Sequence, residues 1–350
     1  MRRLILFVVL AISAFAQQPA SFHIQPVRPV AELRKEALAA EPPMQIGDFY
    51  RPELVELIKL DPTIKLDIRY ASTNNFLSTP MYEEARAFLQ RPAAEALVRA
   101  NQELHAQGFG LLIHDGYRPW YVTKMFWDAT PPDKHEFVAD PAKGSNHNRG
   151  CAVDLTLYDL RTGQAVPMPS LYDEMSERSY PTYKGGSVEE TRNREILRAA
   201  MEKQGFTVYQ SEWWHFDYKD WQKYPVLNVE FAQVPDPAFP HGSGAIEYDG
   251  HRYETAKALY APDPDYPEKG RQAGLDAALS AWVFIGNDGL VKQAIVSKPA
   301  GYGFDEKSLA CLHTWRFEPG KRDGIAVAEM VEVEVTFHLS KNPFNKRQKH

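Results

Sequence analysis

Two periodic patterns of hydrophobic and polar positions, one of strands and one of helices, occur in the first two thirds of the chain. A period of two, typical of strands, occurs in three segments: residues 64–70, 109–114 and 151–158. Apolar positions three and four apart predict one helix at 92–107 and another that starts at a capping box of Ser187 and Glu190 and ends at Gly205. A shorter helical stretch covers 31–39. Strands and helices interleave, which predicts an α+β fold with a central antiparallel sheet flanked by helices.

In residues 225–262 prolines recur without a period, which predicts a linker. Residues 278–285 and 290–296 are strand-like and are joined by Gly286-Asn287-Asp288-Gly289, a hairpin signal. A helix is predicted at 305–315, and 330–339 alternates with its valines pointing inward. The pattern therefore predicts a small second α+β unit.

The two ends of the chain differ from this globular pattern. Residues 1–16 combine two arginines, a short apolar run and Ala14-Phe15-Ala16, as signal peptides do. Since this run is too short for a stable membrane anchor, we expect export, most plausibly to the periplasm. Residues 17–44 are predicted to be irregular around their helical stretch, and 341–350 form a basic tail. The predicted units are thus 45–224 and 263–340.

Composition narrows the class of protein. The 350 residues carry a formal net charge of −6 and show no basic stripe, which excludes nucleic acid as an expected partner. Only two cysteines are present, one in each predicted unit, so no disulfide framework is indicated. Cys151 lies on the apolar side of its strand, and we expect a buried hydrophobe there.

Candidate chemistry centres on the stretch 144–159, GSNHNRGCAVDLTLYD. It places His147 in a polar loop and Asp154 on the more polar face of the following strand, and His215 comes 61 residues after Asp154. Two imidazoles and one carboxylate suit a catalytic zinc ion that keeps a fourth position for water. We predict one zinc ion per chain. His114 is a rival third ligand, but it lies on an apolar strand and is better placed behind the ligands.

Two further residues complete a hydrolytic site. Glu212, three residues before His215, is the candidate general base for a water activated by zinc. Positions three apart on a flat strand face opposite ways, so both residues can serve one site only if the strand bends between them. Arg118, in the turn after the strand 109–114, can stabilise an oxyanion formed from a carbonyl.

Four motifs occur in order over about residues 45–220: DIRYASTNNF at 67–76, GYRP at 116–119, SNHNRGCAVD at 145–154 and EWWHF at 212–216. Together they resemble the zinc D-alanyl-D-alanine dipeptidases of the VanX type. The resemblance implies that His147, Asp154 and His215 bind zinc, that Glu212 is the catalytic base and that Arg118 acts on the transition state. It also implies that Ser145 and Asp173 hold the free amino end of the dipeptide.

The second unit is similar to the C-terminal domain of TonB-like proteins over about residues 260–340. That resemblance rests on Tyr266-Pro267, the 286–289 hairpin, the helix with Arg316-Phe317-Glu318-Pro319 and the last alternating strand. It implies a periplasmic interaction module that contacts an envelope protein or peptidoglycan. A purely structural appendage is the alternative.

The sequence therefore predicts zinc-dependent hydrolysis of the D-alanyl-D-alanine dipeptide in cell-wall metabolism. One alternative is a D,D-carboxypeptidase or endopeptidase acting on peptidoglycan stem peptides, which requires an open cleft. Another is a zinc-stabilised binding module without catalysis, against which the presence of both Glu212 and Arg118 argues.

Overall fold

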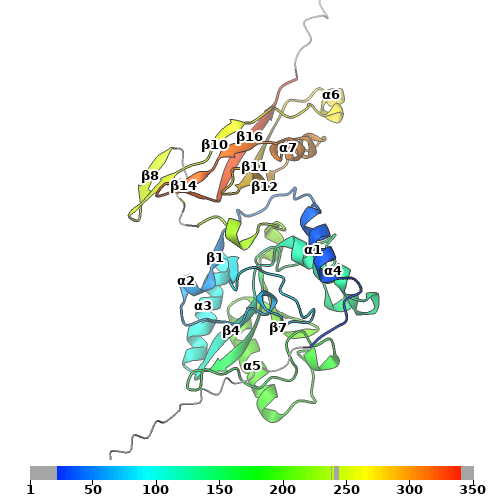
Figure 1. The fold of residues 1–350 in the computed structure, drawn as a ribbon, viewed down its shortest axis with the longest axis vertical. Coiled ribbons are helices and arrows are strands. Elements are labelled where there is room, and N and C mark those ends of the chain that lie inside the picture. Colours follow the sequence, from blue (N-terminus) through cyan, green and yellow to red (C-terminus); the bar gives the residue numbers. More distant parts are fainter. Residues whose placement is uncertain (1–21, 238, 240–243, 340–350) are drawn as a thin grey trace, which may run out of the picture.

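The computed structural model describes residues 22–237, 239 and 244–339. The predicted signal peptide and basic tail lie outside these residues. The chain forms two units stacked along the long axis, a larger one from the N-terminal two thirds and a smaller one from the C-terminal third (Figure 1). Among the described helices, none is long and apolar enough to cross a membrane.

A five-stranded sheet forms the centre of the larger unit. Its order is β2-β4-β5-β7-β6, and every neighbouring pair is antiparallel except β2 and β4. The bounds are β2 Lys65–Leu66, β4 Phe109–Asp115, β5 Ala152–Asp159, β6 Phe206–Tyr209 and β7 Glu212–Tyr218. Nearly the whole of β5 is buried, on both of its faces. The predicted α+β class with a largely antiparallel sheet is confirmed.

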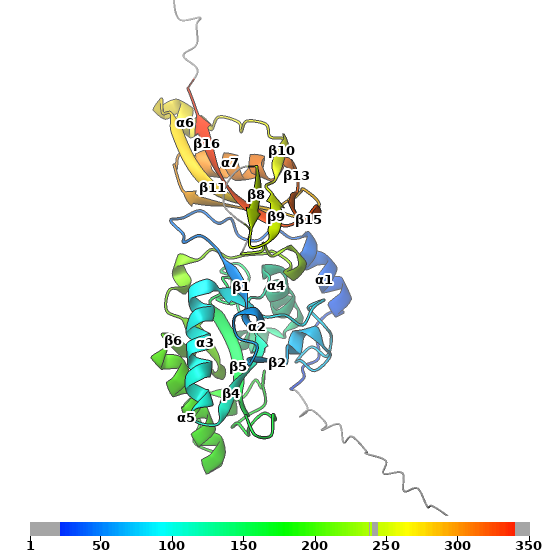
Figure 2. The same cartoon turned by 90° about the vertical axis from the view of Figure 1, so that its left-hand side faces the viewer.

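Helices cover this sheet from different sides. Figures 1 and 2 place α3 (Arg91–His105) on one side of β4, and α1 (Val30–Ala39) with α4 (Trp120–Ala129) on the other. The capping box of Ser187 and Glu190 is present at the start of α5 (Val188–Lys203), as predicted. Shorter elements complete the unit: β1 Leu54–Glu56, α2 Leu57–Leu60 and β3 Phe88–Gln90.

One local expectation fails, and one helix was not predicted. The strand predicted at 64–70 shortens to β2, because the amides of Ala71 and Ser72 bond back to the carbonyls of Ile68 and Arg69 in a 3-10 turn instead of continuing the ladder. No element was predicted where α4 lies; this helix is apolar around most of its circumference, and all but three of its residues are buried.

The C-terminal unit matches its predicted pattern closely. An antiparallel sheet of order β12-β11-β16 carries α7 (Phe304–Leu312) against one face. Its strands are β11 Ala277–Ile285, β12 Val291–Lys298 and β16 Glu329–Phe337, and a short helix, α6 (Glu268–Ala273), precedes them. Along β16, Val335 and Phe337 are buried whereas Glu332, Glu334 and Thr336 are exposed, as the alternation predicts.

The predicted linker at 225–262 is more ordered than its prolines indicate. Its second half forms β8 (Ala245–Tyr248), β9 (His251–Glu254) and β10 (Lys257–Tyr260). Strand β9 pairs with β14 (Gly320–Arg322), which pairs with β15 (Ile325–Val327), and β10 pairs with β13 (Arg316–Glu318). These strands therefore belong to the C-terminal unit by their pairing. The first half contributes Val226, Leu227 and Val229 to the core of the larger unit.

The second face of the C-terminal sheet packs against the larger unit. Trp282, Phe284 and Ile295 are buried in the larger unit's hydrophobic core and not in the core beneath α7. Residues near Gln45 add to the outer edge of β12, where Ile46 bridges Val296 in parallel. One face of the C-terminal sheet thus belongs to the core of the larger unit, and the other face covers a separate core beneath α7.

Candidate metal centre and active site

The loop that carries His147 is held in a tight conformation between two glycines with positive φ. Gly144 has φ +74° and Gly150 has φ +65°, a backbone region that favours glycine. A Cβ atom at Gly150 would lie 2.5 Å from Leu54 Cδ2, so the loop also packs too closely for a side chain there. His147 itself is buried.

Three potential ligand atoms converge beside this loop. His147 Nε2 lies 3.3 Å from Asp154 Oδ1, His215 Nδ1 lies 3.1 Å from the same oxygen, and the two nitrogens are 3.1 Å apart. Asp154 and His215 are directly paired across β5 and β7, which explains how residues so distant in sequence meet. The three residues form a group that could hold a metal ion.

Hydrogen bonds at the outer ring nitrogens orient both histidines. His147 Nδ1 lies 2.8 Å from the carbonyl oxygen of Gly116, and His215 Nε2 lies 3.0 Å from a carboxylate oxygen of Asp217. Since both oxygens can only accept, each histidine donates there, and the other nitrogen of a neutral ring presents a lone pair to the centre.

The donor set fits a tetrahedral zinc ion. Ligand atoms about 2.1 Å from zinc in tetrahedral geometry are roughly 3.3 Å apart, close to the separations observed. Asp154 Oδ1 is buried and has no hydrogen-bond donor among the described residues, although such oxygens are normally satisfied. Despite its burial, the pKa of Asp154 lies well below its usual range when the two histidines are protonated, because positive charge beside the carboxylate favours its ionised form. A cation at this point would satisfy the carboxylate oxygen.

Glu212 and His215 face the same centre because β7 is irregular between them. Val208 of β6 pairs with Phe216, but the next residue, Tyr209, pairs with Glu212, so extra residues of β7 bulge out of the ladder. This confirms the predicted bend. Glu212 Oε2 lies 3.7 Å from His215 Nδ1. Burial raises the pKa of Glu212 to about 7 even though His215 opposes the shift, so its carboxyl can exchange a proton near neutral pH.

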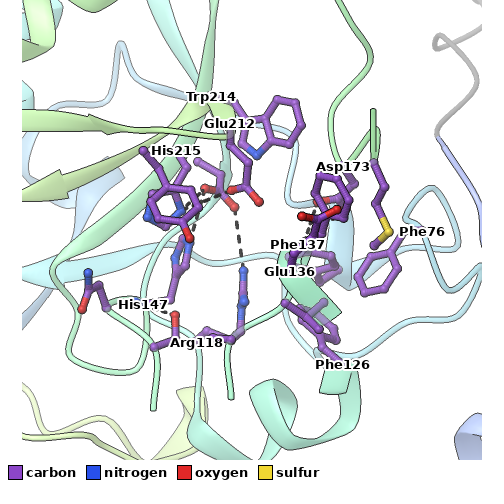
Figure 3. A pocket seen from close by; sticks show the side chains of 18 of the residues that line it. Phe76, Arg118, Phe126, Glu136, Phe137, His147, Asp173, Glu212, Trp214 and His215 are labelled. Atoms are coloured by element: carbon purple, nitrogen blue, oxygen red, sulfur yellow. Dashed lines mark hydrogen bonds and ion pairs between the residues drawn. The ribbon is translucent and has the colours of Figure 1, made fainter. Parts of the chain in front are cut away.

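Arg118 enters the site from the turn after β4. Its guanidinium donates to Asp115 Oδ2, with nitrogen–oxygen distances of 2.8 and 2.9 Å, and lies 3.8 Å from Asp154 Oδ2. The ring of Phe126 stacks beneath it, 4.7 Å from the guanidinium carbon. The side chain is therefore fixed, buried and directed toward the candidate metal centre, as Figure 3 shows.

Ser145 and Asp173 both line the cavity. Ser145 Oγ accepts a hydrogen bond from the His147 amide, which ties it to the ligand loop. Asp173 has φ +61°, an uncommon value for a residue with a side chain, and it accepts a 2.9 Å hydrogen bond from the Tyr70 hydroxyl. Burial, with the nearby Asp154 charge, raises the pKa of Asp173 well above its usual range. A cationic group beside it would be stabilised.

His114 does not join the group of three. It is the residue skipped by the register shift between β4 and β5, and its Nδ1 lies 3.3 Å from the Asp67 carbonyl oxygen. Burial lowers the pKa of His114 to about 3, so it is neutral. Its ring packs on Tyr172, which places it behind the ligands as expected.

Three supporting residues were not anticipated. The Tyr172 hydroxyl donates to Asp154 Oδ2 at 2.8 Å and lies 3.1 Å from the Tyr70 hydroxyl. Asp217 orients His215 and could have been found from sequence, since residues two apart on a strand share a face. Tyr70 and Tyr172 come from loops remote in sequence, and no local pattern predicts their meeting.

The three candidate ligands line a cavity of about 240 Å³ together with Glu212, Arg118, Ser145 and Asp173. Figure 3 shows His147, His215, Glu212 and Arg118 on one side of it, and Asp173 with aromatic side chains on the other. The apolar part of the lining consists chiefly of Phe76, Phe126, Phe137, Val138 and Met175. The cavity can therefore take a small molecule with both ionised and apolar groups.

Comparison with known proteins agrees with both parts of the architecture. Residues 51–235 match the family described as D-ala-D-ala dipeptidase, and 262–339 match the Gram-negative bacterial TonB protein C-terminal family. The D-alanyl-D-alanine dipeptidase of Escherichia coli K12 is 36% identical over 191 residues, which are 55% of this chain and 97% of that protein. The enzyme of the same name from Enterococcus faecium is 38% identical over 206 residues, covering 54% and 98%.

The C-terminal unit has relatives of its own. It is 26% identical over 77 residues to the TonB protein of Vibrio cholerae, covering 22% of this chain and 32% of that protein. The family match to residues 51–235 spans more than half of the chain, and the dipeptidases that resemble it are covered almost completely. The chain is therefore a member of the D-Ala-D-Ala dipeptidase family of metallopeptidases, with a TonB-like domain at its C-terminal end.

Proposed function

We propose that this protein hydrolyses the dipeptide D-alanyl-D-alanine to free D-alanine, with one zinc ion held by His147, Asp154 and His215. The observation that carries the proposal is the convergence of two imidazole nitrogens on a buried carboxylate oxygen that lacks a donor among the described residues. The names of the family relatives support the substrate.

Zinc bound at this centre would supply Lewis acidity, which lowers the pKa of water to about 7 and polarises a carbonyl. Glu212 would then move the protons. Its carboxylate takes the proton of the attacking water and later delivers it to the nitrogen of the leaving amino acid. A pKa raised to about 7 suits both roles at neutral pH.

Arg118 would stabilise the negative charge that develops on the peptide oxygen. Asp115 and Phe126 hold its guanidinium in place before substrate arrives, so little reorganisation is needed during the reaction. The charge of Arg118 also faces Asp154, which favours the ionised form of that ligand.

Asp173 and Ser145 would bind the free amino end of the dipeptide. An ammonium group beside Asp173 restores the charge balance of a buried carboxyl whose pKa is raised by its surroundings. The aromatic lining of the cavity suits the methyl groups, and its volume of about 240 Å³ favours a dipeptide over a long stem peptide.

The TonB-like domain, together with the signal-peptide pattern of residues 1–16, supports action in the cell envelope. We infer that the enzyme is exported to the periplasm, serves cell-wall metabolism and contacts an envelope protein or peptidoglycan through its C-terminal domain.

The decisive experiment offers purified, zinc-loaded protein the free dipeptide and, separately, a stem peptide ending in D-Ala-D-Ala. We expect D-alanine release from the dipeptide, loss of that activity after chelation and recovery with added zinc. Cleavage of the stem peptide without cleavage of the dipeptide would instead identify a carboxypeptidase.

A further inference from the structure

Gln293, on β12 of the C-terminal domain, reaches across to the larger unit. Its Nε2 donates to the carbonyl oxygen of Val226 at 2.8 Å, and its Oε1 accepts from the amide of Asn228 at 2.9 Å. The side chain is buried. One amide thus bonds to the segment 226–229 at two points, in the way that a neighbouring strand would.

The opposite side of the segment 226–229 supports the catalytic elements. The Leu227 amide donates to the carbonyl oxygen of Asn148, next to His147, at 2.9 Å. The Leu227 carbonyl accepts from the amide of Trp120, and Asn228 Oδ1 accepts from the amide of Tyr121. These are first-turn amides of α4, which lack partners within the helix, and α4 begins two residues after Arg118.

Asn148 continues this network into the site. Its fully buried side chain donates to the Arg118 carbonyl oxygen at 2.8 Å and accepts from the Ser145 amide at 2.7 Å. The Arg118 amide in turn donates to the His147 carbonyl oxygen at 3.1 Å. The loop that carries His147, a proposed metal ligand, and the turn that carries Arg118 are therefore both hydrogen-bonded to the side chain of Asn148.

We propose that Gln293 is a positioning residue and that, through it, the TonB-like domain holds the His147 loop and the Arg118 turn in their active arrangement. The inference rests on the proposed function only where it concerns zinc. The interface is continuous and buried, because Trp282, Phe284 and Ile295 exclude water beside Gln293. Loss of its amide would leave the Val226 carbonyl and the Asn228 amide buried and unpaired, so the segment would shift or loosen.

The test compares Gln293→Ala with two controls in the full chain. Ser297→Ala removes a buried hydroxyl of the same strand that bonds only within the C-terminal sheet, at the Ser280 carbonyl. Gln233→Ala removes a contact between the units, to Asn287, that lies at the surface and does not involve residues 226–229. Zinc affinity is measured by competition with a chelating dye, and loop opening by hydrogen exchange of the Leu227 and Gly150 amides.

We expect Gln293→Ala to weaken zinc binding by about two- to thirtyfold and to speed exchange at both amides, while both controls behave as wild type. If Gln293→Ala does not fold, Gln45→Ala, which removes the bond to the Val226 amide, is expected to change both measurements in the same direction. Wild-type affinity and exchange in the folded variant would overturn the inference. Should the wild type bind no zinc, the proposed function fails, but the exchange comparison still decides this point.

Discussion

The central sheet of the dipeptidase domain and the sheet of the C-terminal domain differ in where their register shifts lie. In the C-terminal sheet, β11 and β16 pair without any shift, from Ala277 opposite Phe337 to Ile285 opposite Glu329. The register of β11 and β12 shifts twice, after Ser280 and after Phe284, and neither residue lines the cavity. The dipeptidase sheet is interrupted twice, between β4 and β5 at His114 and between β6 and β7 before Phe216. Both interruptions border the candidate site, where they turn Asp115 and Glu212 inward.

This difference shows what the bulges provide. Strict alternation sends neighbouring residues to opposite faces, which suits a domain with an apolar inner face and a polar outer face. A site that needs several charged groups at one point requires the alternation to break. The cost is a concentration of buried carboxylates, which Arg118, the histidines, tyrosine hydroxyls and the Gly116 amide compensate.

The largest expected effect comes from Glu212, at the second interruption. Glu212→Gln keeps the shape of the side chain but cannot take a proton, so we expect kcat to fall by about 10²–10⁴-fold with zinc content unchanged. Glu189→Gln, an exposed change on α5, serves as the control. Turnover by Glu212→Gln at the wild-type rate would remove Glu212 from the mechanism.

Arg118, after the first interruption, should come next. Arg118→Lys keeps the charge needed by buried Asp115 but loses the planar fork. We expect the initial rate at saturating dipeptide to drop by about 10²–10³-fold, whereas Arg99→Lys on the exposed side of α3 leaves it unchanged. A change confined to KM would show that Arg118 binds the substrate and the transition state equally well.

A smaller effect is expected for the hydroxyl that supports Asp154. Tyr172→Phe removes the 2.8 Å hydrogen bond to Asp154 Oδ2, and such supporting contacts typically change metal affinity by about 10–100-fold. Isothermal titration with zinc measures this. Tyr253→Phe makes the same chemical change at a buried site of the C-terminal domain and should bind zinc like the wild type.

The smallest effect is expected on β16, which pairs with β11 without a register shift. Thr336 is exposed on β16, and Thr336→Ala should alter the free energy of unfolding by no more than about 0.5 kcal/mol. Urea denaturation measures that change. A large loss would mean that the outer face of β16 is packed against something, and the contrast between the two sheets would weaken.

Local sequence patterns predicted the elements whose structure depends mainly on residues close together in the sequence. The hairpin and alternating strand of the C-terminal domain and the capped helix α5 follow from side-chain periodicity and one hydrogen-bonded cap. The requirement for a bend before His215 was also readable, since Glu212 and His215 would otherwise face apart. Helix α4 was missed because only Lys124 and Asp128 mark a polar face in a segment that is otherwise almost entirely apolar.

What the sequence could not predict depends on register between distant segments. The Gly116 carbonyl that orients His147, and the tyrosine pair that reaches Asp154 and Asp173, become neighbours only once β4, β5 and the 172–175 loop are in place. The two hydrogen bonds between Gln293 and residues 226–229 likewise depend on how the two domains pack together. Short motifs carry no information about such contacts.

The stretch near Gln45 has a consequence for the order of folding. Gln45 bonds to Val226, 181 residues away, and its neighbour Ile46 pairs with Val296 of the C-terminal sheet. Contacts this distant in sequence slow folding, because the chain entropy lost in closing such loops precedes the gain. We expect refolding to show a fast phase for each domain's own core and a slower phase in which the N-terminal segment is captured between them. Activity should recover only with the slow phase, since the support of the His147 loop is completed last.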